Sequence, residues 1–527
     1  MAQGGKAQTL FQNGHIWTGR SSRPARALAV GDGCILGVGE SNDVDGMCGR
    51  DTRVIDLAGQ TLIPGFVDAH AHLWKIGHLL TTLLDLRQVA SVGELGQRLR
   101  EHARRLAPDA WLQGRGYNEA RFAEGRGPTR DDLDAVIEDR PVVLMRTCAH
   151  IVVCNSRALE LAGIDRNTTA PAGGEIDRDR DGRPTGVLRE TAMALVHRHV
   201  PPPSADDYER MLHSAIRHQW SLGITSTTDA GVGPELLAVY LNLDADRRLT
   251  GRVNVMALAL VDGVGRVPLP PTPHVSDHLR VDTAKFFADG GLSGATAALS
   301  VRYRHADTHG VLRMTADELY EHARAPHAAG WRLATHAIGD TAIEHVLDAY
   351  ERLGPGPVRH RIEHFGLPTP GQLARAARLG VLAAPQAIFI RELGRNFRRY
   401  LPDDLLPRVY PIRAMLDAGM TVALSSDAPV VENDSPLAGI QAALLRRDEE
   451  GEPVAAGEAI SIEEALDSYT LGGALACGAD RDQGRLEAGM RADMAVVSGN
   501  PFDTPPEALT ELRVTQTWLG GRIVYEA

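Results

Sequence analysis

The amino-acid sequence predicts an α/β fold: a (β/α)8 TIM-like barrel with a flanking β-sandwich formed by both chain ends and an insert after the first barrel strand. Three observations carry this prediction. Buried-type strands alternate with helical stretches through the middle of the chain, both ends are rich in short β-type runs, and one gap between strands is far too long for a loop. A chain of 527 residues is also too long for one simple core.

The two chain ends share one pattern, short β-type runs separated by glycine. The runs are residues 9–11, 15–18, 27–30, 34–38, 52–55, 492–497, 514–519 and 522–525. Such spacing is typical of a small antiparallel sheet. We therefore assign residues 1–60 and 480–527 to one β-sandwich.

Eight strands of buried type follow in order between the two ends. They are residues 61–67, 224–228, 253–261, 281–287, 332–335, 359–363, 381–384 and 421–424. Helical stretches fall in the gaps, among them residues 316–329, 341–353 and 411–418. Eight strands with intervening helices favour a closed barrel over an open sheet, and we assign it to residues 61–84 and 204–479.

The gap after the first barrel strand carries elements of its own. A strand is expected at residues 141–145 and a helix start at 155–159, so residues 85–203 are predicted to be an inserted subdomain. Barrel enzymes keep their active sites at the C-terminal ends of the strands, where such insertions lie. We therefore expect the insert to lie over the active site and to shape substrate access.

Composition limits the partners and the compartment. The net charge of −12 argues against nucleic acid or an anionic membrane as the main partner, and no stretch reaches the ~18 apolar residues that span a bilayer. Five widely spread cysteines and the lack of a secretory signal suit reduced thiols in a cytoplasm. We expect a cytoplasmic protein with a small-molecule substrate, and a homodimer is the oligomer we consider.

Candidate metal ligands stand where several predicted strands end. His70 and His72 lie two residues apart at the end of the first strand, so both imidazoles point to one face and can bind one metal ion. The matching residues at the ends of later strands are His336, His364 and Asp427. Because a barrel gathers its strand ends around one mouth, these side chains are expected to lie together.

Each candidate also has an ordinary structural explanation. A single histidine at a strand end is more often a hydrogen-bonded core residue, and Asp427 could cap a helix that begins at Ala428. Lys285, in the otherwise apolar fourth strand, could extend its amine to solvent. An unpaired ammonium inside a barrel is costly, however, so something should neutralise it.

Carbamylation of Lys285 would neutralise it, because CO2 added to the amine makes a carboxylate that can bridge two metal ions. His70, His72 and Asp427 would then surround one ion, and His336 and His364 the other. Imidazole nitrogen and carboxylate oxygen suit two zinc ions, and manganese, iron and nickel also fit. A site with one metal ion and an ordinary Lys285 amine stays open.

The chain also resembles the amidohydrolase superfamily, and within it the YtcJ-like branch that includes N-substituted formamide deformylases. The resemblance rests on residues 64–72, 155–159, 173–176, 182–190, 285–290, 336–340, 361–364 and 426–429. It implies a barrel with a flanking β-sandwich and metal positions on the same six residues. Ala295 and the segment 384–386 depart from the pattern of many relatives near the expected mouth, so pocket contacts are expected to differ.

These residues predict a metal-dependent amidohydrolase that acts on carbon-nitrogen bonds other than peptide bonds. Metal-activated hydroxide would attack the carbonyl of an amide, N-substituted formamide or cyclic amide, and Asp427 would move the proton to the leaving nitrogen. A metal-dependent isomerase or ring-opening enzyme of a biosynthetic pathway is the alternative. A small-molecule binder without catalysis is a third possibility.

Residues outside the ligand set are predicted to contact the substrate or to orient the ligands. The candidate substrate contacts are His150 and Tyr117 in the insert, and Tyr303 and Arg304 after the fourth strand. Packing within the insert and exposure on a loop are the respective alternatives. Glu363 and Asp340 neighbour candidate ligands and are expected to orient imidazoles.

Overall fold

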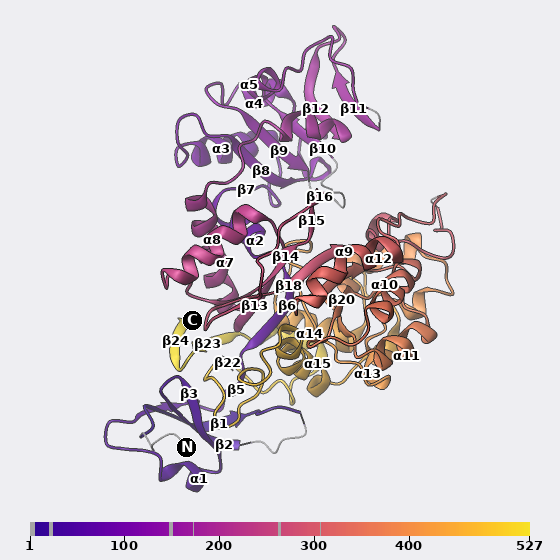
Figure 1. The fold of residues 1–527 in the computed structure, drawn as a ribbon. Helices are drawn as coiled ribbons and strands as arrows, with labels where there is room; N and C mark the ends of the chain where they lie inside the picture. The colour runs from indigo at the N-terminus through magenta and orange to yellow at the C-terminus, as the bar shows by residue number, and fades with distance from the viewer. Residues whose placement is uncertain (1–5, 21–24, 147–150, 172, 262–264, 306) are drawn as a thin grey trace. The chain divides into compact units, whose positions relative to one another are not determined.

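The computed structural model describes residues 6–20, 25–146, 151–171, 173–261, 265–305 and 307–527 (Figure 1). By its internal contacts the chain divides into two compact units, Met1–Trp74 with Ala215–Ala527, and Lys75–Ser214. The first unit contains the barrel and the flanking sheet, and the second is the insert. The predicted fold class is confirmed.

Seven parallel strands form the barrel wall, each hydrogen-bonded to the next. In spatial order they are β6 (Phe66–Ala71), β13 (Ile224–Val232), β14 (Arg252–Leu258), β18 (Leu279–Phe287), β19 (Arg332–Ala337), β20 (Arg361–His364) and β21 (Leu382–Ala384). Figure 1 shows β6, near the start of the chain, among strands that follow the insert. Almost every residue of these strands is buried, as expected for parallel strands covered on both faces.

The eighth predicted strand is reduced to one parallel bridge between Ala383 and Val422. Leu424 leaves this ladder, because its backbone N–H donates to the Ser468 carbonyl at 3.1 Å. The gap to β6 is closed further along, where the Asp427 N–H donates to the His70 carbonyl at 2.7 Å. The barrel is therefore nearly closed, and its seam runs through two candidate metal ligands.

The first predicted strand, residues 61–67, is divided at Gly65 between two sheets. Strand β5 (Thr61–Pro64) pairs antiparallel with β22 (Met494–Val497) in the flanking sheet, and β6 begins at Phe66. A Cβ atom added to Gly65 would lie 2.2 Å from Thr225 Oγ1, so no side chain fits at the crossing. The chain thus passes from one sheet to the other at a residue that must be glycine.

Strands from both chain ends form the flanking sheet, as predicted. Its order is β24 (Arg522–Glu526), β23 (Val514–Leu519), β22, β5, β1 (Thr9–Ile16), β2 (Ala25–Gly31) and β3 (Cys34–Gly39), and β4 (Arg53–Asp56) also pairs with β1. Phe11 and Trp518 meet edge to face in its core with ring centroids 4.9 Å apart. The two ends of the chain therefore stabilise each other.

Helices follow the barrel strands. They are α8 (Pro234–Ala245), α9 (Ala316–Ala328), α10 (Asp340–Leu353), α11 (Pro370–Arg378), α12 (Ile388–Tyr400), α13 (Ile412–Asp417), α14 (Pro436–Leu445), α15 (Ile462–Tyr469) and α16 (Leu471–Cys477). Capping boxes at Thr315, Thr369 and Ser461 start α9, α11 and α15. Figure 1 shows the later helices, in red and orange, gathered beside β20. Among the described residues no helix is long and apolar enough to cross a membrane.

The second unit has its own sheet and core. The sheet order is β11 (Gly174–Arg178), β12 (Pro184–Glu190), β10 (Ile151–Cys154), β9 (Val142–Arg146), β8 (Leu112–Tyr117) and β7 (Leu84–Asp85). Its helices are α3 (Val92–Ala103), α4 (Arg130–Asp134), α5 (Ser156–Leu161) and α6 (Ala194–His197), and the ends of the unit fall within α2 (Leu73–Thr81) and α7 (Ala205–Ser221). The buried Asn155 side chain caps α5 by accepting from Ala158 N–H at 3.0 Å. The placement of the insert over the barrel mouth stays a prediction.

Candidate metal centre

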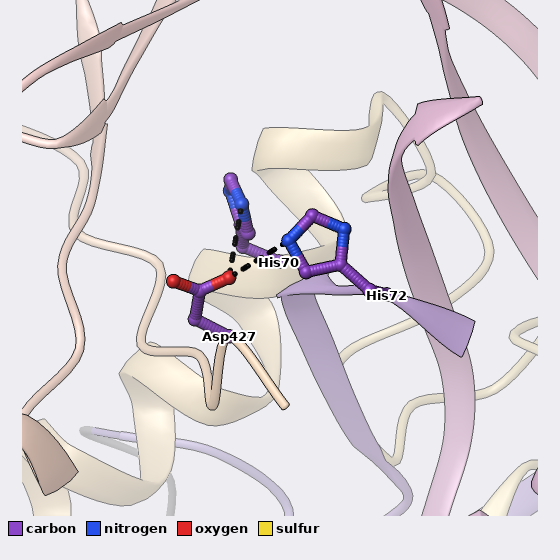
Figure 2. Close-up of side chains that lie close together, drawn as sticks. All are labelled: His70, His72 and Asp427. Atoms are coloured by element: carbon purple, nitrogen blue, oxygen red, sulfur yellow. Dashed lines mark ion pairs between the residues drawn. The ribbon is translucent and has the colours of Figure 1, made fainter. Parts of the chain in front are cut away.

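Three candidate ligands converge at the seam of the barrel (Figure 2). His70 and His72 extend from the end of β6, and Asp427 faces them from the segment after the eighth strand position. Asp427 Oδ1 lies 3.5 Å from His70 Nε2 and 3.2 Å from His72 Nε2. One ligand atom from each of the three residues lies within 4.8 Å of the others, which is close enough to share one metal ion.

The hydrogen bonds of the two imidazoles fix which ring nitrogen carries the proton. His70 Nδ1 contacts the Glu363 carboxylate, and His72 Nδ1 lies 2.8 Å from the Ala230 carbonyl oxygen. An ionised carboxylate and a carbonyl can only accept, so each Nδ1 donates. Burial, with Lys285 nearby, lowers the pKa of His70 to about 4, so this ring is neutral at pH 7. His70 Nε2 therefore presents a lone pair, and the Nδ1 contact of His72 likewise leaves Nε2 as the atom that can bind a metal ion.

Both lone pairs point at a carboxylate oxygen that has no proton to share. Hydrogen bonding from His72 and the positive charge of a protonated imidazole lower the pKa of Asp427 against the effect of burial, and a divalent cation held by neutral rings would keep the carboxylate ionised in the same way. Within the described part of the chain, its buried Oδ1 makes no hydrogen bond. Three electron-pair donors therefore face one another without a proton between them. Such a group fits a divalent cation, which would neutralise the repulsion.

The backbone around Asp427 is held in an unusual conformation. Asp427 has φ of 54°, in the left-handed region that non-glycine residues rarely adopt, and His364 has φ of 68°. The buried Asp68 carboxylate accepts from Ser426 Oγ at 2.6 Å and so ties β6 to the residue before Asp427. The next helix begins at Pro436, so Asp427 is not a helix cap. Both strained backbones position candidate ligands.

His336 and His364 lie beside the first three ligands. They come from the ends of β19 and β20, and their ring centroids are 4.4 Å apart, while the His364 ring is 4.9 Å from that of His70. His336 Nε2 lies 3.1 Å from the Gly290 carbonyl oxygen, which can only accept. His336 therefore donates from Nε2 and keeps its lone pair on Nδ1.

Lys285 lies inside the barrel rather than at an edge. Its side chain, on β18, is 1% exposed, and in the described region its Nζ has no hydrogen-bond partner. Burial lowers the pKa of the amine to about 8, although Glu363 and Asp427 act in the opposite direction. Nζ lies 4.9 Å from the centroid of the Phe287 ring. Because the side chain is buried, the alternative in which Lys285 extends its amine to solvent does not apply.

A buried ion pair supports His70 from behind. Arg361 donates to both oxygens of Glu363, at 2.5 Å from Nε and 2.9 Å from Nη2, and Glu363 accepts from His70 Nδ1. Burial alone would raise the pKa of Glu363, but Arg361 and His70 together hold it well below its ordinary value. Glu363 thus orients an imidazole, as we expect from its place beside His364 in the sequence.

Asp340 has a different role from the one predicted, and Asp289 stands in its place. Asp340 accepts from the Ser300 N–H and hydroxyl, at 2.9 and 2.5 Å. Asp289 Oδ1 lies 3.4 Å from His336 Nε2, and the same carboxylate accepts from the Ile338 and Gly339 N–H groups. Sequence reasoning missed Asp289, although an acidic residue two positions after a buried strand is the available signal.

The predicted substrate contacts are not all described. His150 falls in residues 147–150, outside the described part of the chain. Tyr117 lies on β8 in the second unit, 3% exposed, with its ring 6.4 Å from that of Phe122. The buried Tyr303 donates its hydroxyl to the Ala297 carbonyl at 2.8 Å, and Arg304 pairs with Asp403 at 2.6 Å. Their roles in substrate binding stay predictions.

Comparison with known proteins places the chain in a family. Residues 53–525 match the amidohydrolase family. The chain belongs to the amidohydrolase family. It is therefore a hydrolase, and the resemblance seen in its motifs is confirmed.

Relatives of this amidohydrolase match it almost end to end. It is 33% identical to the YtcJ protein of Bacillus subtilis (strain 168), over 98% of this chain and 99% of the relative. It is 32% identical to N-substituted formamide deformylase of Arthrobacter pascens, over 95% of each. A crystal structure of an uncharacterized metal-dependent hydrolase from Pyrococcus furiosus superposes with a TM-score of 0.79 at 29% identity, covering 94% of this chain and 100% of that one.

Proposed function

We propose that this amidohydrolase uses bound metal to cleave the C–N bond of an amide, N-substituted formamide or cyclic amide. One observation carries the proposal: the Nε2 lone pairs of His70 and His72 converge on the ionised Asp427 Oδ1. The full-length similarity to an enzyme named N-substituted formamide deformylase supports the choice of bond.

We assign two metal positions to the six candidate ligands. His70, His72 and Asp427 would hold one ion, His336 and His364 the other, and Lys285, carbamylated, would lie between them. In that modification neutral Nζ attacks the carbon of CO2 and releases one proton, which leaves a carbamate anion. The buried Nζ supports this assignment, because it makes no hydrogen bond among the described residues and the modification removes a buried positive charge. Zinc is the metal we infer from these donors.

A divalent ion in this site supplies Lewis-acid chemistry, which acidifies water and polarises a carbonyl oxygen. The chain itself contributes a general base, Asp427, whose carboxylate faces His70 and His72. Asp427, 6% exposed and ionised, accepts the proton of the attacking water and delivers it to the leaving nitrogen. His70 and His72 donate their Nδ1 protons to Glu363 and to the Ala230 carbonyl, which leaves Nε2 of each ring to hold the ion.

A panel of N-formyl, N-acetyl and cyclic amides, incubated with enzyme of known metal content, tests the proposal. We expect at least one product heavier by one water by mass spectrometry. A product of unchanged mass would contradict hydrolysis and favour the isomerase alternative.

The role of Asp427 is tested separately by Asp427→Asn, with Asp434→Asn as the matched control. Asp434 lies in the same segment but pairs with His218 at 2.8 Å. We expect loss of turnover in the first variant and near wild-type turnover in the second. Wild-type turnover by metal-loaded Asp427→Asn would refute the assignment.

We extend the proposal to a cytoplasmic location and a homodimer. The cysteines of the described residues are free, and Cys154 and Cys477 are buried, which supports a reducing compartment. Light scattering on the purified enzyme tests the oligomeric state.

A further inference from the structure

Gln386 is a fully buried polar residue next to the candidate ligands. It follows β21, the only complete barrel strand after β18 whose end carries no candidate ligand among the described residues. Its side chain is 0% exposed, and Oε1 lies 2.7 Å from His364 Nδ1. A buried amide must satisfy both its ends, so the partners of its nitrogen determine which way it faces.

The partners of Gln386 Nε2 allow only one orientation of the amide. Nε2 donates to the Ala384 carbonyl at 2.8 Å and to Ser425 Oγ at 2.8 Å. The Ala384 carbonyl can only accept, so a flipped amide would set two acceptor oxygens against each other at that distance. The Ser425 hydroxyl donates onward to the Pro385 carbonyl at 3.4 Å, so it too is an acceptor for Gln386.

This orientation determines the tautomer of His364. Because Oε1 only accepts, His364 Nδ1 must donate, and the lone pair of His364 is left on Nε2. From this geometry we propose that Gln386 is a positioning residue that holds His364 in its ligating tautomer, bridging the ends of the sixth, seventh and eighth strands. The inference rests on the proposed metal site, and it assigns a function to the one later strand that supplies no ligand.

Cobalt titration of the metal-free full-length enzyme tests this role through binding and spectrum rather than turnover. Gln386→Met keeps the shape but removes the acceptor and both donors. We expect its affinity for the second cobalt ion to fall about 10- to 100-fold, with a changed visible spectrum, while the first ion binds as in the wild type. Gln386→Glu, which restores an acceptor for His364 Nδ1, should recover most of the lost affinity.

Gln441→Met is the matched control, because Gln441 is also buried and its side chain contacts Arg391 and backbone carbonyls away from the candidate ligands. Wild-type cobalt affinity and spectrum in Gln386→Met would overturn the role of Gln386, and so would equal losses in the Met and Glu variants. If Gln386→Met fails to fold, the Glu variant alone decides: cobalt binding as weak as in a His364→Ala variant would refute the role. No cobalt uptake by the wild type would overturn the metal site itself.

Discussion

Replacing Glu363 by glutamine tests whether the buried ion pair behind His70 supports the metal centre. Glu363 is 0% exposed and Arg361 is 1% exposed. Three donors face the carboxylate: Nε and Nη2 of Arg361, and Nδ1 of His70. A glutamine has one acceptor oxygen, so at least one of these donors would meet the amide NH2 group. Arg361 would keep only carbonyl partners, such as Ala69 at 2.8 Å.

The magnitude follows from the charge that is left without its partner. Removing one member of a buried pair costs about 3–5 kcal/mol, and in a unit of this size about 1 kcal/mol lowers Tm by about 2 °C, so Tm should fall by roughly 6–10 °C. Metal affinity should fall about 10- to 100-fold, because His70 loses the acceptor that fixes its tautomer. Differential scanning calorimetry and metal titration measure the two effects.

Glu344→Gln is the control for loss of a charge as such. Glu344 pairs with Arg375 at 2.8 Å, but its side chain is 50% exposed, so this pair contributes at most about 1 kcal/mol. We expect Tm and metal affinity close to wild type. If Glu363→Gln behaves like Glu344→Gln in both measurements, the buried pair does not support the site and the reasoning is wrong.

Three further predictions concern Lys285, the metal and pH. Lys285→Met should raise Tm of the metal-free protein, because it removes a buried amine that makes no hydrogen bond among the described residues. The same variant should lower turnover at least about 100-fold, and unchanged turnover would contradict a role in the site. Chelation should lower Tm reversibly, and by less in Asp427→Asn, where the repulsion of His70 and His72 is relieved. Burial lowers the pKa of His360 to about 3, so the stability that this neutral ring contributes is fully present above pH 7 and falls by about 2 kcal/mol at pH 5. In urea unfolding, His360→Gln should therefore reduce the loss between pH 7 and pH 5 by about that amount, and an unchanged loss would contradict the assignment.

The positions of the candidate ligands could be predicted because a barrel converts order along the chain into closeness in space. Once the strands that end in His70, His336 or His364 are assigned to a parallel barrel, the fold itself brings their ends together. The helices were predictable for a local reason, since capping residues such as Thr315 and Ser461 mark their starts.

The partners of those ligands could not be predicted, because each depends on a contact between distant segments. Nothing in the sequence connects His72 with the Ala230 carbonyl, or His364 with Gln386. Asp340 is only four residues from His336 in the sequence and Asp289 is 47 residues away, yet it is Asp289 that faces the ring, whereas Asp340 accepts from Ser300. The division of the first strand at Gly65 likewise depends on where Thr225 packs.

The burial of Lys285 has a practical consequence that follows from the rarity of lysine in this chain. Of its 56 basic residues only three are lysine, Lys6, Lys75 and Lys285, and the first two are exposed. Any spectroscopic signal from a lysine amine that is protected from solvent therefore comes from Lys285, inside the barrel. With 13C-labelled CO2, a carbamate resonance that resists exchange would report on this one position without mutation or isotope labelling of the protein. Because the other basic residues are almost all arginine, carbamylation of Lys285 can be detected in the unmodified sequence.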